Sequence, residues 1–420
     1  MVTVLFIFYL VLFCWLLTKS RFINGAGIST KIIIGLFLLK VLMGCLHPLV
    51  LQGTSGMFDT TVFQREGLLE YHLLWQDPKA YFTNLFYSPY ADGYGGVFSS
   101  SHSYWNNLKD NLIIKLISVC NIFSLGYYVV NIVFFNYVAF FGAIALYRVF
   151  KTVYPKKDGL LIAGCFLLPS LLFFTSAINK EVLLFAALGM AVFTIHSILQ
   201  FGVSFKKIAY CLMVLIFIFL QRNYMLFAFL PGTIAWVLVH KKKYRAIHTF
   251  VITYLVAGAI FFTTGFISAE LNFPQAIVNK QIAFIQLEPG HTNLRLRLLE
   301  PNMESFLSNL PQAISHALLR PFLTDVHFAP GLLPLVMELL AYELLFLLSI
   351  CFRENKKGVN PFILFSLFFA GSVLLLIGYI VPAIGAVARY RAIYLPFIIT
   401  PLLASTDWKK LSSFINNKRI

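Results

Sequence analysis

Long apolar runs separated by short polar segments make up almost the whole chain. Most of these runs are about twenty residues long, the length that an α-helix needs to cross a hydrocarbon core of about 30 Å. The pattern predicts an all-α, polytopic integral membrane protein in which 1–420 forms a single transmembrane domain. Taken in order, the runs predict about eleven membrane-spanning helices, near 2–18, 32–51, 126–147, 159–176, 182–199, 208–220, 225–240, 249–268, 331–352, 361–383 and 392–405.

The composition supports a membrane protein and excludes a soluble globular one. Hydrophobic residues make up 59% of the sequence and charged residues 12%, whereas soluble domains carry roughly 25% charged residues. The net charge of +16 could indicate nucleic-acid binding. The basic residues, however, lie in short clusters between apolar runs, which is typical of cytoplasmic loops that face an anionic leaflet. We therefore expect membrane lipids, and no nucleic acid, among the partners.

The distribution of charge also predicts the orientation of the chain. Lys and Arg concentrate in the polar segments that follow alternate helices, and cytoplasmic loops carry such an excess. A single arrangement, with the N-terminus outside and the C-terminus in the cytoplasm, places all of these clusters in the cytoplasm. Two long segments then lie outside: a first outer loop over 52–110 and a second outer loop over 269–330. Both hold more acidic than basic residues.

Carboxylates gather near the start of the first outer loop. If this stretch is helical, Asp59, Glu66 and Glu70 lie at positions i, i+7 and i+11, on one face. Clustered carboxylates raise one another's pKa values, so they can serve as a general base or bind a divalent cation. A solvated acidic face on a surface helix is the structural alternative.

Basic residues at the predicted outer ends of helices depart from the positive-inside trend. Lys180 precedes an apolar helix, Arg222 lies in a short turn, and Arg389 and Arg391 open the last helix. Arginine forks bind phosphate well, so these four residues are candidates for binding an anionic substrate. Snorkelling to lipid headgroups is the structural alternative.

Further candidates lie in the second outer loop, which contributes His291, Arg295, Arg297, His316 and Arg320. Arg295 and Arg297 are two residues apart, so they would not share a helix face. The sequence shows no HxxxH or HExxH spacing, so we predict no metal cluster.

The predicted spans themselves hold three charged residues of note: Lys40, Glu338 and Glu343. An unpaired charge in a bilayer is costly, so we expect Lys40 to pair with Glu338 or Glu343.

Three segments resemble the GT-C superfamily of membrane glycosyltransferases, which take sugars from polyprenyl-phosphate carriers. They are the acidic first loop with Asp59, the turn Phe-Thr-Ser-x-x-Asn-Lys180-Glu181, and Ala388-Arg389-Tyr390-Arg391 followed by Tyr394-Leu395-Pro396. The resemblance implies a bacterial inner-membrane enzyme of polysaccharide assembly, with a lipid-linked sugar donor and a glycan acceptor. Asp59, helped by Glu66 or Glu70, would then act as the general base. We do not predict a specific cofactor, and a divalent cation, Mg²⁺ or Mn²⁺, is an open alternative.

A second resemblance is to O-antigen polymerases and ligases, which depend on arginines and a histidine in outer loops. Arg222, His291, Arg295, Arg297 and His316 would then matter more than Asp59. The alternative from another class is a transporter or flippase of lipid-linked glycans, in which Lys40, Glu338 and Glu343 line a path.

Overall fold

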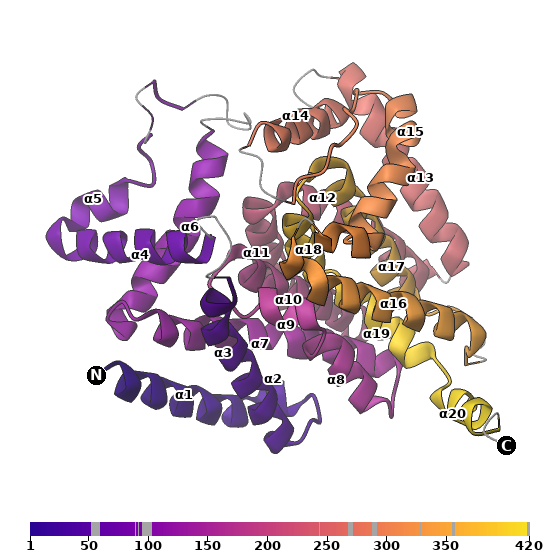
Figure 1. Cartoon of the computed structure of the whole chain (residues 1–420), viewed down its shortest axis with the longest axis horizontal. Helices are drawn as coiled ribbons and strands as arrows, with labels where there is room; N and C mark the ends of the chain where they lie inside the picture. The colour runs from indigo at the N-terminus through magenta and orange to yellow at the C-terminus, as the bar shows by residue number, and fades with distance from the viewer. Residues whose placement is uncertain are drawn as a thin grey trace. The chain divides into compact units, whose positions relative to one another are not determined.

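The computed structural model describes residues 1–51, 59–88, 90, 92–94, 103–242, 244–267, 272–287, 292–327, 329–354 and 358–417. Within these ranges all regular structure is helical (Figure 1). Strand-like pairing in the same ranges is limited to two isolated bridges, Asn293 with Ala383 and Arg353 with Thr406. The predicted all-α fold class is confirmed.

Eight helices in the described part of the chain are long and apolar enough to cross a membrane. A ninth span results if α18 (Ile384–Ala392) and α19 (Leu395–Ser405), which meet at 63°, count as one bent segment. These helices indicate a multi-pass membrane protein, while eleven spans and the orientation stay predictions. The eight are α1 (Val2–Lys19), α3 (Thr30–Leu51), α7 (Tyr128–Val153), α10 (Lys180–Phe201), α12 (Asn223–Lys242), α13 (Ala246–Ile267), α16 (Leu333–Cys351) and α17 (Pro361–Ile380).

The apolar run near 159–176 is not one continuous helix. It forms α8 (Asp158–Phe166) and α9 (Pro169–Phe174), which are separated by two residues. Pro169 explains the break, because a proline disfavours helical backbone at the residue before it and has no N–H to continue the helix. The run near 208–220 forms α11 (Phe205–Gln221), which has 17 residues.

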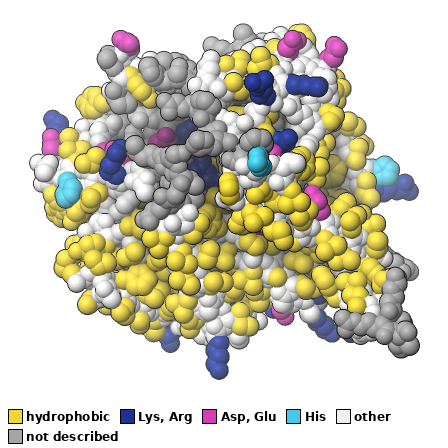
Figure 2. All heavy atoms as spheres, in the orientation of Figure 1, with side chains coloured by type: hydrophobic (Ala, Val, Ile, Leu, Met, Phe, Trp, Pro, Cys, Tyr) yellow, Lys and Arg dark blue, Asp and Glu magenta, His cyan; other side chains and the backbone are white. Residues whose placement is uncertain are grey.

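Many apolar side chains of the spanning helices are exposed, as lipid-facing residues are. On α13, Leu255 is 68% exposed and Phe266 is 90% exposed. Figure 2 shows hydrophobic side chains over much of the visible face. Such a surface would be unfavourable in water, so it fits a hydrocarbon environment.

The chain divides into two compact units, each of which is described by itself. Unit 1 comprises Met1–Val149 and Leu171–Asn223, and unit 2 comprises Phe150–Ser170 and Tyr224–Ile420.

In unit 1, α7 and α10 pack with their backbones in close contact. A Cβ atom built on Gly189 would lie 2.2 Å from the carbonyl oxygen of Gly142, so only glycine permits this approach. The short helix α2 (Arg21–Asn24) follows α1, and the Ser20 hydroxyl caps its N-terminus. The contact between Gly142 and Gly189 lies near the middle of α10 and holds α10 against α7.

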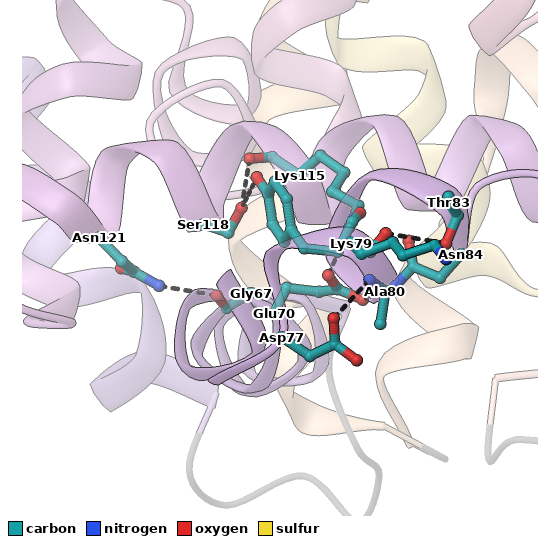
Figure 3. Close-up of polar contacts among 11 residues, drawn as sticks. Gly67, Glu70, Asp77, Lys79, Ala80, Thr83, Asn84, Lys115, Ser118 and Asn121 are labelled. Atoms are coloured by element: carbon teal, nitrogen blue, oxygen red, sulfur yellow. Dashed lines mark hydrogen bonds and ion pairs between the residues drawn. The ribbon is translucent and has the colours of Figure 1, made fainter. Parts of the chain in front are cut away.

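Most of the described residues of the predicted first outer loop are helical. It contains α4 (Asp59–Gln76) and α5 (Pro78–Thr83), and α6 (Tyr104–Ser124) begins within it. Gly67 lets α4 approach α6, since a Cβ atom there would lie 2.4 Å from the Ile117 side chain. Asn121 of α6 donates to the Gly67 carbonyl oxygen at 3.0 Å (Figure 3).

Unit 2 has an aromatic core around α17. Phe365 and Phe369 of α17 stack with ring centres 5.6 Å apart, and Phe229 of α12 meets both edge-on. Gly164 of α8 packs directly against Thr400 of α19. The remaining helices of unit 2 are α14 (Phe273–Ile285), α15 (Met303–Ile314), η2 (Ser315–Leu319), η3 (Leu323–His327), η4 (Pro330–Leu332) and the C-terminal α20 (Trp408–Asn417).

Candidate functional site

The carboxylates of the first loop lie on one helix, as the sequence predicts, but their surroundings differ. Asp59 is the first residue of α4, and its side chain lies outside the described part of the chain. Glu66 accepts a hydrogen bond from the neighbouring Arg65 at 2.9 Å, with the Arg65 side chain 60% exposed. A solvated pair of this kind contributes little to stability.

Glu70 is tied into the packing of α4, α5 and α6. It accepts a hydrogen bond from Lys115 at 2.5 Å and another from Asn84 at 2.7 Å. The Lys115 ammonium also donates to the Tyr81 carbonyl oxygen and lies 3.6 Å from the centre of the Tyr81 ring. Figure 3 shows Glu70 and Lys115 facing one another between their helices. These contacts indicate that Glu70 joins the three helices together.

Lys180, the first residue of α10, brings three helices of unit 1 together. It forms an ion pair with Asp110 of α6. Its ammonium also lies 5.4 Å from the centre of the Phe63 ring of α4. Phe63 follows Asp59 by four residues, so both positions lie on the same face of α4. A predicted phosphate-binding residue is thus located beside the helix face that begins with the predicted base.

The next residue of α10, Glu181, pairs with Arg222 at the end of α11. Their closest oxygen and nitrogen atoms are 2.5 Å apart, and the side chains are 2% and 9% exposed. Gln221, beside Arg222, donates to the Lys109 carbonyl oxygen of α6 at 3.2 Å. Arg222 therefore already binds a buried carboxylate of its own unit, a contact that the sequence analysis did not predict.

Two asparagine side chains fix the turn between α9 and α10. Asn179 caps α10 by accepting from the Val182 N–H at 3.1 Å, and it donates to the Phe174 carbonyl oxygen at 2.9 Å. Asn136 donates to the Ser176 carbonyl oxygen at 2.8 Å. These bonds satisfy backbone groups that helix ends leave without partners.

Lys40 of α3 holds the same turn. The buried ammonium donates to the Thr175 carbonyl oxygen, to the Thr175 hydroxyl at 2.7 Å and to the Ser176 hydroxyl at 3.3 Å. Within unit 1 the partners described for Lys40 are thus neutral oxygens, which the sequence analysis did not consider, because it looked only for charged partners. Glu338 and Glu343 belong to unit 2, so their pairing with Lys40 stays a prediction.

In unit 2, Glu338 has neutral partners as well. Its Oε1 atom accepts from the backbone N–H and the hydroxyl of Ser170, both at 3.0 Å, and from the Tyr342 hydroxyl at 2.5 Å. Glu338 is 7% exposed. Glu343 is exposed on the same helix.

Arg391 of unit 2 is almost fully buried. It is 2% exposed and donates to the carbonyl oxygens of Ala317 at 3.0 Å and Arg320 at 2.9 Å. Its Nε atom has no hydrogen-bond partner among the described residues. Arg389, on the same helix, is half-buried and donates to the Tyr390 hydroxyl at 3.3 Å.

Two second-loop candidates lie beside Arg391. His316 of η2 donates from Nε2 to the Val381 carbonyl oxygen at 2.7 Å. Burial, together with the positive charges of Arg320 and Arg391, lowers the pKa of His316 from its ordinary value of 6.5. Arg320 pairs with Asp325 at 3.5 Å. Three predicted residues, from two separate parts of the sequence, therefore converge in unit 2.

The other second-loop candidates do not join this cluster as described. Arg295 and Arg297 are exposed on a segment without regular structure, so the expectation about helix faces does not apply. His291 lies outside the described residues. The described ranges contain no group of three His, Cys, Asp or Glu side chains that could hold a metal ion.

Sequence reasoning missed the residues that contact the candidates in each unit. These partners are Asp110 and Lys115 in unit 1, and Ser170, Tyr342 and Asp325 in unit 2. Asp110 and Lys115 carried a usable signal, because they lie five residues apart in a stretch that is less apolar than the spans. Ser170 and Tyr342 carried none, since neutral hydroxyls are common in membrane helices. Comparison of the chain with family models, with curated proteins and with solved structures finds no match.

Proposed function

We propose that this chain is a membrane glycosyltransferase of polysaccharide assembly in a bacterial inner membrane. It would transfer a sugar or oligosaccharide from a polyprenyl-(pyro)phosphate carrier to a glycan acceptor at the outer face. The observation that supports this proposal is the meeting of α4, α6 and α10 in unit 1, where Lys180 lies 5.4 Å from the Phe63 ring, one turn from Asp59. A cation at the end of a membrane span, beside the helix that begins with Asp59, suits a sugar linked to a lipid phosphate.

The proposed reaction assigns one role to each charge. The Asp59 carboxylate takes the proton of the acceptor hydroxyl, and the acceptor oxygen forms a bond to the anomeric carbon. The bond between that carbon and the carrier's phosphate oxygen breaks, and its electron pair stays on the phosphate. Lys180 stabilises the negative charge of the departing (pyro)phosphate, which is the largest charge that develops in the reaction.

Release of the carrier (pyro)phosphate by purified protein in nanodiscs tests the proposal. The probes are radiolabelled polyprenyl-phosphate and polyprenyl-pyrophosphate sugars, offered as a panel with membrane glycans as acceptors. Asp59→Asn should lower turnover by ~10²-fold or more while donor binding survives, because the amide is nearly isosteric but is not a base. Asp92→Asn, which changes an exposed carboxylate of the same predicted loop, is the matched control. Release that is equal in both variants would reject Asp59 as the base.

A second candidate function, a polysaccharide polymerase of the O-antigen type, is supported by a different observation. His316, Arg320 and Arg391 lie together in unit 2, and Arg391 donates to the Arg320 carbonyl oxygen at 2.9 Å. Polymerisation that is abolished by His316→Gln and unaffected by Asp59→Asn would favour this candidate. If no variant changes glycan transfer in purified membranes, both enzymatic proposals fail.

A further inference from the structure

Helix α15 has an apolar face that the rest of the described chain leaves uncovered. Its inner face, with Phe306, Asn309 and Ala313, is buried. The outer face carries a continuous stripe of exposed apolar side chains at helical spacing, namely Met303, Leu307, Pro311, Ile314 and, in η2, Leu318. Leu307 is 55% exposed. We call these five residues the α15 stripe.

A stripe of this kind is unfavourable in water, because each Å² of exposed apolar surface costs roughly 25 cal/mol relative to burial. The stripe is not needed for packing, since the opposite face of α15 already contacts the rest of unit 2. A continuous exposed apolar stripe indicates a protein partner or a membrane.

The neighbours of α15 identify the membrane. Phe306 meets Phe261 and Phe262 near the C-terminal end of α13, with ring centres 5.7 and 5.5 Å apart. It also accepts a hydrogen bond from Tyr379, the penultimate residue of α17, through its carbonyl oxygen at 2.6 Å. Both α13 and α17 are long and apolar enough to span a membrane. The α15 stripe therefore belongs to a helix that packs beside the ends of two helices able to span a membrane.

Two arginines border the stripe. Arg295 and Arg297 are exposed. Gln312 of α15 holds their segment by donating to the Arg295 carbonyl oxygen at 3.2 Å and accepting from the Arg297 N–H at 3.1 Å. Gln281 of α14 adds a bond to the Arg297 carbonyl oxygen at 3.1 Å. The backbone is thereby fixed, while the guanidinium groups extend outward.

We propose that α15 and the Arg295–Arg297 segment form a lipid-binding surface on the membrane. The stripe inserts into the acyl boundary, and the two arginines bind the phosphates of anionic phospholipids. An apolar helix face flanked by basic residues is the pattern of an interfacial amphipathic helix. A protein partner would need to cover the stripe but would leave the adjoining exposed ends of α13 in lipid, so the leaflet is the occupant that fits both.

Spin-label accessibility in the full-length protein tests the stripe. A nitroxide is attached at Leu307→Cys in nanodiscs, with Leu255→Cys on α13 as the lipid-facing control and Glu300→Cys as the water-facing control. The unsubstituted chain, labelled in parallel, gives the background of its natural cysteines. Leu307 should resemble Leu255, with oxygen more accessible than a water-soluble nickel chelate. Preferential access of the nickel chelate, as at Glu300, would overturn the proposal, and so would low access of both, which indicates a covering protein.

The arginines are tested with the same label and two lipid compositions. In nanodiscs of phosphatidylcholine with added phosphatidylglycerol, the oxygen preference at Leu307 should rise relative to phosphatidylcholine alone. Arg295→Gln/Arg297→Gln should abolish that rise, since each arginine near an anionic surface strengthens attraction by about fivefold. Lys280→Gln, on α14, is the control. No response of the native chain to phosphatidylglycerol would refute the role of the arginines. None of these readouts depends on sugar transfer.

Discussion

Removal of the arginine from the buried Glu181–Arg222 pair separates a structural role from a substrate-binding role. Both side chains are at least nine-tenths buried, and their closest atoms are 2.5 Å apart. Arg222→Met would leave the Glu181 carboxylate buried without its cation. Loss of one member of such a pair destabilises a protein by about 3–5 kcal/mol, because an uncompensated charge remains in a medium of low polarity.

A double-mutant cycle makes the reasoning quantitative. Glu181→Gln/Arg222→Met removes both charges, so we expect its free energy of unfolding to recover to within ~2 kcal/mol of the native value. The coupling energy between the two positions should then be about 2 kcal/mol or more. This is well above the deviation from additivity that independent sites show. Reversible unfolding in mixed micelles with increasing SDS measures all four proteins under one condition.

Additive effects would refute this account of Arg222. If Arg222→Met alone changes the free energy of unfolding by less than ~1 kcal/mol, Glu181 is not a buried charge that depends on it. Carrier (pyro)phosphate release by the double variant then distinguishes the roles further. A structural arginine allows release to recover along with stability, whereas a phosphate-binding arginine does not.

Three further perturbations test the packing, the loop and the buried histidine. Gly189→Ala should destabilise unit 1 by about 1–3 kcal/mol in the same unfolding assay, because its Cβ would meet a backbone carbonyl oxygen at 2.2 Å; Gly258→Ala, with nothing within 4 Å, should not. Lys115→Met should speed hydrogen exchange in α4 and α6, whereas Lys79→Met, at an exposed position, leaves it unchanged. Burial lowers the pKa of His316 below 6.5 in the folded chain. The unfolded chain therefore binds the proton at higher pH than the folded chain does, and the free energy of unfolding should fall as pH drops through 6.5. His316→Gln should flatten this pH dependence in unfolding measured from pH 8 to 5.

The apolar runs were enough to predict the all-α class and the eight described helices that are able to span a membrane, because the period and length of a run depend only on local sequence. They did not predict α6 or α15. Both helices carry polar residues at intervals that interrupt an apolar run, such as Lys109 and Asp110 in α6. A helix at a membrane surface needs only one apolar face, so its sequence resembles a loop when the search is for continuous hydrophobicity.

The candidate charges could be identified from sequence, but their partners could not. Lys180 and Asp110 are 70 residues apart, and Lys40 and Thr175 are 135 residues apart. Each pairing depends on which faces of two helices meet, and the sequence of one chain does not determine that. The neutral partners of Lys40 within unit 1 show the consequence. In a membrane protein the free carbonyl and hydroxyl oxygens at a helix end compete with carboxylates for an ammonium group.

The partners now separate the predicted phosphate-binding residues into two kinds. Lys180 and Arg222 each pair with a carboxylate of unit 1, so a phosphate that binds there must displace that carboxylate or share the cation with it. Arg391 donates hydrogen bonds instead to two carbonyl oxygens, which orient the guanidinium. Lys180 differs from Arg222 in having a half-exposed partner, since the Asp110 side chain is 42% exposed. Because an exposed pair in water is worth little, Asp110 yields to an incoming phosphate more readily than the buried Glu181 does. In unit 1, Lys180 is therefore the cation best placed to meet the proposed lipid-linked substrate, and Arg222 is the one best placed to hold α10 and α11 together.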